Sequence, residues 1–121
     1  MLSAARGARA AAYAPYSRFR VGAAVLDADG RIFGGCNVEN ASSASALCAE
    51  QSAVAAAVAA GARRLRGVLV LTGARIPTAP CGRCRQVLAE FGGDVAVVMV
   101  TTGGKSREST LSELLPHPFR R

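Results

Sequence analysis

The sequence predicts an α/β sandwich in which helices cover a mixed β-sheet. Two observations indicate this fold: short β-prone runs alternate with helical segments, and the first two runs are spaced as a hairpin. The 121 residues are enough for one core, so we expect a single domain spanning 1–121. Half of the residues are hydrophobic but only 5% are aromatic, which predicts an interior of closely packed Ala, Val and Leu.

The first helix and the hairpin are expected in the first third of the chain. Residues 2–12 are rich in Ala and Arg and should be helical, and the helix should end before Pro15, which disfavours helix at the residue preceding it. Two β-prone runs, 21–26 and 31–36, are separated by Asp-Ala-Asp-Gly, a sequence typical of hairpin turns.

The remaining elements alternate between helix and strand. Residues 37–47 form a polar, Ser-rich loop, and 48–61 a helix closed by a glycine and two arginines. Continuous apolar runs at 67–71 and 95–101 predict buried strands, with a helix at 82–91 between them. Beyond these elements we expect a turn at 103–106 and a short helix at 111–115 that stops before Pro116.

The charge and the apolar runs exclude several kinds of partner. The net charge of +7 comes almost wholly from arginines scattered between Arg6 and Arg121, without the basic stripe interleaved with aromatics that nucleic-acid binding needs. The longest apolar run, 53–62, is too short to cross a bilayer. Arg6 and Arg9 interrupt any secretory signal. We therefore expect a cytoplasmic protein with reduced cysteines that binds neither nucleic acid nor membrane.

Three of the four cysteines fall at predicted helix starts. Cys81 and Cys84 have the spacing that places two side chains on one face of a helical turn, and Cys48 opens the preceding helix. The free N–H groups and the dipole at a helix start favour thiolate over thiol. Three sulfur ligands with one open position is the layout of a catalytic zinc site. The alternative, a thioredoxin-like redox pair at Cys81 and Cys84, leaves the "CAE" at Cys48 to Glu50 unexplained.

Glu50 adds the group that such a site needs to move protons. Residues two apart in mid-helix point about 200° away from each other, so Cys48 and Glu50 share a site only if Cys48 lies at or before the first turn. A carboxylate beside a zinc-activated water can take its proton and deliver it to a nitrogen. Cys-x-Glu followed by Pro-Cys-x-x-Cys is the pattern of zinc-dependent nucleobase deaminases.

With these motifs, the sequence resembles the cytidine deaminase family, in particular its small, three-cysteine, homotetrameric class. The resemblance implies a three-layer α/β/α sandwich with a mixed five-stranded sheet, and hydrolytic deamination of cytidine and 2'-deoxycytidine to the uridines in pyrimidine salvage. Five blocks carry it in order along nearly the whole chain: "AYAPYSRFRVGAAV" at 12–25, "GRIFGGCNVENAS" at 30–42, "CAE" at 48–50, "PCGRCRQVL" at 80–88 and "LSELLPHPF" at 111–119.

The resemblance also implies roles for individual residues. One zinc per chain would be bound by three thiolates, and Glu50 would hydrogen-bond ring N3 of the nucleoside substrate and transfer protons as ammonia leaves. The zinc ligands would be Cys48, Cys81 and Cys84. The substrate contacts would be Asn37 and Glu39 at the ribose hydroxyls, Phe19 on the base, the Ala49 backbone N–H at the base O2, and Phe119, whose counterpart in family members reaches a neighbouring subunit's pocket.

Two positions depart from the family pattern. Three-cysteine members commonly carry "CAER", whose arginine offsets the excess thiolate charge, but this chain has Gln51 there. We hypothesise that Arg85, next to Cys84, or the helix ends supply the missing positive charge. Ser43 stands where the family usually has a tyrosine, which affects the expected substrate and the expected tetramer geometry.

Three other functions are open at this point. A pocket reshaped for an unusual aminopyrimidine nucleoside, such as blasticidin S, would use the same chemistry. A nucleic-acid cytosine deaminase would need a channel for flanking nucleotides, and the chain has no extra segment to build one. A non-catalytic zinc module could be closed by Cys36, which we interpret instead as a core thiol at a strand end. His117, the only histidine, receives no catalytic role.

Overall fold

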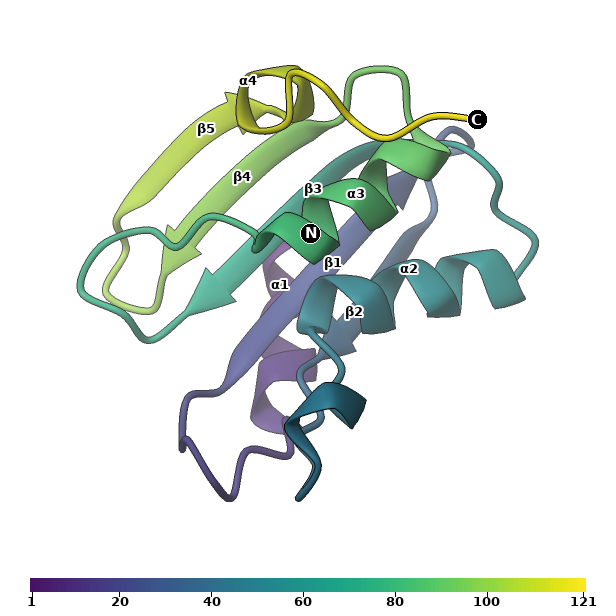
Figure 1. Cartoon of the computed structure of the whole chain (residues 1–121). Coiled ribbons are helices and arrows are strands. Elements are labelled where there is room, and N and C mark those ends of the chain that lie inside the picture. Colours follow the sequence, from purple (N-terminus) through teal and green to yellow (C-terminus); the bar gives the residue numbers. More distant parts are fainter.

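The computed structural model describes residues 1–121 as a mixed five-stranded sheet between two layers of helices, which confirms the predicted fold class (Figure 1). The strand order is β2-β1-β3-β4-β5. The elements in chain order are α1 (Leu2–Ala10), β1 (Val21–Asp27), β2 (Ile32–Cys36), a 3₁₀ turn (Ser43–Ser45), α2 (Ala49–Ala59), β3 (Leu65–Thr72), α3 (Gly82–Phe91), β4 (Ala96–Thr101), β5 (Ser106–Thr110) and α4 (Leu111–Leu114).

The strand directions bring several chain segments together at one end of the strands. β1 runs antiparallel to both β2 and β3, whereas β3 and β4 are parallel and are connected through α3. The pair Val21 and Thr72 therefore brings the beginning of β1 next to the end of β3. The loops that lead into α2 and α3 leave the sheet at this same end. Ligands commonly bind outside the carboxyl ends of the strands in open α/β sheets.

The two faces of the sheet carry cores of different size. The 16-residue core lies under α2 and α3 and consists largely of Ala, Val and Leu, as the composition predicts. The opposite face is covered by α1, which packs on β1, β2 and β3 with a core of only four buried residues, Ala5, Ala24, Leu69 and Leu71. Figure 1 shows α1 behind the sheet and α2 and α3 in front of it.

Two glycines allow the helices to approach the strands closely. A Cβ at Gly35 of β2 would lie 2.3 Å from the Ala53 backbone nitrogen of α2, and one at Gly22 of β1 would lie 2.0 Å from the Ala5 carbonyl of α1. Glycine is required where one backbone approaches another this closely. The contact at Gly35 thereby fixes the position of α2, the helix that begins next to Cys48.

The turn of the β1–β2 hairpin contains a buried carboxylate. Asp27 is 1% exposed and accepts hydrogen bonds from the backbone N–H groups of Asp29 and Arg31 and from the Arg31 guanidinium at 2.7 Å. Burial alone raises the pKa of Asp27, but these bonds and the Arg31 charge outweigh it and lower the pKa below its ordinary value. Asp27 and Arg31 form the only ion pair of the structure, far along β1 from Val21.

Every helix and strand predicted from the residue pattern is present, with ends shifted by a few residues at most. The structure contains one further strand, β5, which the residue pattern alone does not predict. Its sequence "SREST" has no apolar alternation, and it pairs only with β4 at the edge of the sheet. None of the helices combines the length and the apolar character that crossing a membrane requires.

Candidate active site

Two helices present their first residues to the same point in space. Cys48 is the N-cap of α2 and Cys81 is the N-cap of α3, both in extended backbone conformation. Cys84 follows within the first turn of α3 and is completely buried. Cys48 therefore meets the condition set by helix geometry, because it precedes the first turn that contains Glu50.

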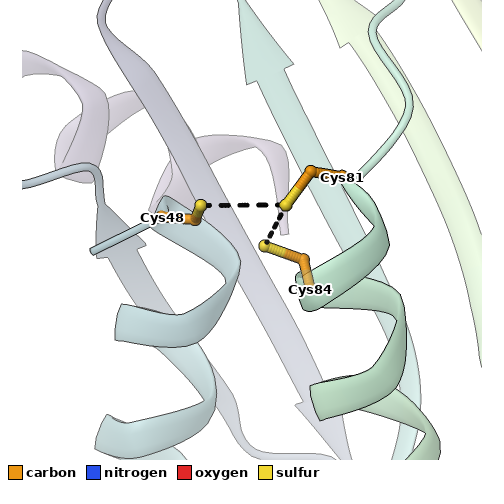
Figure 2. Close-up of side chains that lie close together, drawn as sticks. All are labelled: Cys48, Cys81 and Cys84. Atoms are coloured by element: carbon orange, nitrogen blue, oxygen red, sulfur yellow. Dashed lines mark hydrogen bonds between the residues drawn. The ribbon is translucent and has the colours of Figure 1, made fainter. Parts of the chain in front are cut away.

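The three sulfurs form one cluster (Figure 2). Sγ of Cys81 lies 3.9 Å from Sγ of Cys48 and 3.4 Å from Sγ of Cys84, and all three lie within 4.8 Å of one another. Zinc–sulfur bonds of about 2.3 Å in tetrahedral geometry place two sulfurs roughly 3.8 Å apart. All four cysteines are free, and Cys36 is not part of the cluster, so the donor set fits one zinc ion held by three thiolates.

Glu50 lies against this cluster and is almost completely buried. Its Oε2 is 3.6 Å from Sγ of Cys84, and the residue is 5% exposed. Burial raises the pKa of Glu50 above its ordinary value, and its own backbone N–H and the Cys84 thiol counteract this only in part. No arginine or lysine forms an ion pair with it. A buried carboxyl group with a raised pKa and no cationic partner is suited to take up and release protons.

The thiols differ in their surroundings. Burial and the neighbouring Glu50 carboxylate raise the pKa of Cys84 strongly. Burial also opposes ionisation of Cys81, but the N–H groups of Cys84 and Arg83 and the neighbouring thiols lower the pKa of this residue below its ordinary value. A thiolate at the α3 start is thus favoured by the helix geometry itself.

An open cavity of about 260 Å³ leads to the cluster from the edge of the sheet. Its lining includes six of the sequence-predicted site residues, namely Asn37, Glu39, Cys48, Ala49, Glu50 and Cys81. Val21, Val70, Thr72 and Thr78 also line it. Thr72 and Thr78 were not predicted as site residues, since a threonine at a strand end and one in a loop carry no signal in a single sequence.

Asn37 and Glu39 organise the loop before β1. Asn37 accepts from the Val21 N–H through Oδ1 and donates to the Phe19 carbonyl through Nδ2, each at 2.8 Å. Glu39 accepts from the Tyr16 and Ser17 N–H groups and from the Ser17 hydroxyl. These bonds lower the pKa of Glu39, with the Ser17 hydroxyl as the main cause. The carboxylate is thus ionised at neutral pH and is fixed beside the cavity.

Gln51 lies between the starts of α2 and α3. Its Oε1 accepts from the Cys48 N–H at 3.3 Å and from Nη2 of Arg83 at 3.0 Å. Arg85, which together with the helix ends was hypothesised as a source of positive charge, directs its guanidinium to the carbonyls of Pro80 and Leu114, each at 2.7 Å. Arg83 was not predicted as a site residue, although its position inside "PCGRC" between two candidate ligands was a signal.

The two predicted aromatic contacts do not line the cavity of the isolated chain. Phe19 is 40% exposed, and its N–H donates to the Ser17 hydroxyl at 3.0 Å. Phe119 is 72% exposed on the outer side of α3, where its backbone N–H and carbonyl both bond to the Gln86 side chain at 3.0 Å. The Gln86 contact holds Phe119 in a defined outward position.

The fold and the cluster together define a class of protein. Helices on both faces of a mixed sheet, three thiols at two helix starts and a buried carboxyl group beside an open cavity describe an α/β metalloprotein with three protein ligands. Protein-supplied ligands that leave one position accessible are typical of catalytic zinc.

A comparison with protein-family models identifies the family within this class. Residues 1–101 match the model described as the cytidine and deoxycytidylate deaminase zinc-binding region. The chain therefore belongs to the cytidine and deoxycytidylate deaminase family, which confirms the family resemblance and agrees with a zinc cofactor at the cysteine cluster.

Individual relatives match over nearly the whole chain. The cytidine deaminase of Sporosarcina psychrophila is 42% identical over 98% of this chain and 88% of its own length. That of Mycobacterium tuberculosis is 46% identical over 93% of this chain and 81% of its own length. The crystal structure of cytidine deaminase from Burkholderia pseudomallei superposes with a TM-score of 0.92 at 46% identity, covering 97% of this chain and 94% of the other.

Proposed function

We propose that this protein is a zinc-dependent enzyme that hydrolyses cytidine and 2'-deoxycytidine to the corresponding uridines and ammonia. The single observation that carries the proposal is the contact between Glu50 and the cluster of Cys48, Cys81 and Cys84 at the inner end of an open cavity. Relatives named cytidine deaminases, 42–46% identical over almost the full chain, support it.

The three cysteines would hold the zinc ion as thiolates. When bound, zinc supplies a Lewis acid that lowers the pKa of a water molecule to about 7. Glu50 would take one proton from the attacking water and deliver it to ring N3. It would then move the proton of the hydroxyl group added at C4 to the amino group, so that ammonia leaves as the C4=O bond forms. The low exposure of Glu50 keeps bulk water from competing for these protons.

The cavity wall would orient the nucleoside. The ionised Glu39 and the amide of Asn37 retain free lone pairs and N–H groups after their loop contacts, and both face the cavity, where they would bind the sugar hydroxyls. The Ala49 N–H would donate to O2 of the base. Phe19 would pack on the flat pyrimidine.

We further propose that the chain, as one domain, works as a homotetramer in the cytoplasm in pyrimidine salvage. The position of Phe119 supports the assembly, because its backbone is anchored to Gln86 while its 72% exposed aromatic ring is available for insertion into a second copy. Light scattering coupled to size-exclusion chromatography tests the assembly. A monomer that deaminates cytidine at the full rate would contradict it.

A substrate panel tests the reaction. Purified, zinc-loaded protein is expected to bleach the ultraviolet absorbance of cytidine and 2'-deoxycytidine with release of one ammonia per nucleoside. The panel should include blasticidin S, free cytosine and a single-stranded oligonucleotide. Protein that carries one zinc per chain but leaves every aminopyrimidine nucleoside unchanged would refute the proposed function and favour a non-catalytic zinc module.

A further inference from the structure

A single arginine connects the two helix starts that carry the cysteines. Nη2 of Arg83, in the first turn of α3, donates to Oε1 of Gln51 in the first turn of α2, at 3.0 Å. The same nitrogen donates to the carbonyl of Ala46, also at 3.0 Å. Ala46 belongs to the loop before α2 and lines the cavity.

The acceptor on Gln51 extends this connection to a cysteine. Oε1 of Gln51 also accepts from the backbone N–H of Cys48, which closes a capping box at the start of α2. Arg83 is itself flanked by Cys81 and Cys84. Hydrogen bonds therefore run from Arg83, which lies between the two cysteines of α3 in the sequence, through Gln51 to the cysteine of α2.

Arg83 also brings a positive charge close to the cysteine cluster. A zinc ion with three thiolates carries a net charge of minus one, and no lysine or arginine forms an ion pair with the nearby Glu50. The Arg85 guanidinium instead donates to the carbonyls of Pro80 and Leu114. This leaves Arg83 as the cation that is hydrogen-bonded to a residue contacting the cluster.

We propose that Arg83 is a positioning residue that holds the starts of α2 and α3 at the separation required for three thiolates to share one zinc ion. The proposal rests on the zinc site of the proposed function. Residues that orient metal ligands typically change metal affinity 10- to 100-fold when replaced. Because Arg83 also holds Ala46, it couples the metal site to the wall of the substrate cavity.

The test measures zinc release from the purified holoprotein into an excess of a chromogenic chelator. Arg83→Met keeps an unbranched apolar stem but removes the guanidinium with its charge and donors, and should accelerate release roughly tenfold. Arg83→Lys should restore most of the wild-type rate, since an ammonium group can donate to the same two acceptors. Arg107→Met, which removes an exposed arginine from β5, is the control matched for charge and should leave the rate unchanged.

A double-mutant cycle tests the hydrogen-bonded connection. In a Gln51→Ala background, Arg83→Met should accelerate release clearly less than it does in the wild type, because one of its two acceptors is already absent. Fully additive effects, or an Arg83→Met variant that releases zinc at the wild-type rate, would overturn the proposal. A wild-type protein that binds no zinc would instead refute the proposed function, so the two failures are distinguishable.

Discussion

Two buried carboxylates at opposite ends of the molecule have opposite surroundings. Asp27, in the hairpin turn, is 1% exposed and is bonded by two backbone N–H groups and the Arg31 guanidinium. Glu50, beside the cysteine cluster, is 5% exposed and has no cationic partner. The pKa of Asp27 is lowered by its bonds to Arg31, and the pKa of Glu50 is raised by burial.

The difference separates a structural carboxylate from one suited to catalysis. Asp27 has its acceptor sites filled by the chain itself and stays ionised, which stabilises the turn. Glu50 pays a desolvation cost in its ionised form that the rest of the chain does not offset, and its acceptor sites are left for water, substrate or a proton. Equal burial therefore does not imply an equal role, and the partners of each carboxylate decide it.

The largest expected effect is a difference in catalytic activity between variants of Glu50 and Asp27. Glu50→Gln should lower kcat by roughly 10²–10⁴-fold, because an amide cannot accept the proton of the attacking water. The zinc content, measured by atomic absorption, should stay near one per chain, since the three thiols are unchanged. Asp27→Asn is the matched control, and it should keep kcat near the wild-type value at a temperature where it is folded. Equal losses in the two variants would break the comparison.

The second effect concerns stability and its dependence on pH. Asp27→Asn removes an ionised acceptor from Arg31 and should lower the melting temperature at pH 7 by several degrees. Because the folded pKa is below the unfolded value of 3.8, the Asp27 contribution is present above that value and is lost as pH falls through the lowered pKa. Calorimetry should show the two melting temperatures converging in acid. A constant gap between them would contradict the assignment of Asp27.

A smaller effect of opposite sign is expected at Glu50. In the zinc-free protein at pH 7 to 8, Glu50→Gln should raise the melting temperature by a few degrees, since a neutral amide is cheaper to bury than an unpaired carboxylate. The raised pKa means that the cost of the carboxylate appears as pH rises above the unfolded value of 4.5, so the gain should vanish below that pH. If Glu50→Gln lowers the melting temperature under these conditions, the Glu50 carboxylate must have a stabilising partner in the folded protein, which would contradict this prediction.

The sequence predicted the parts of this molecule that depend on local pattern. Apolar runs, glycines, prolines and the Asp-Ala-Asp-Gly turn predicted all four α-helices and four of the strands, and the cysteine spacing predicted the cluster. The hydrophobic pattern did not give β5, because Ser106 to Thr110 is a polar edge strand whose existence depends on pairing with β4.

The site contacts that escaped prediction are those made between distant segments. Arg83 and Gln51 are 32 residues apart, and Ser17 and Glu39 are 22 apart. Such bonds depend on how the loops meet at the ends of the strands. Neither hydrophobic periodicity nor composition encodes that arrangement. The same reason explains why Arg85 was expected at the sulfurs although its guanidinium lies on the Pro80 and Leu114 carbonyls.

The smallest expected effect tests a third carboxylate, Glu39, which combines features of the other two. It is bonded to the chain like Asp27, through the Ser17 hydroxyl, and it faces the cavity like Glu50. Ser17→Ala removes one bond to Glu39 and the acceptor for the Phe19 N–H at 3.0 Å. We expect KM for cytidine to rise about fivefold, which corresponds to one hydrogen bond of about 1 kcal/mol, with kcat nearly unchanged.

The split between KM and kcat decides which carboxylate Glu39 resembles. A rise in KM alone means that Ser17 and Glu39 shape the binding wall, because ground state and transition state then lose the same contact. A fall in kcat at constant KM would mean that the loop acts on the reacting atoms, as Glu50 is proposed to do. Ser109→Ala on β5, away from the cavity, is the matched control and should leave both constants unchanged.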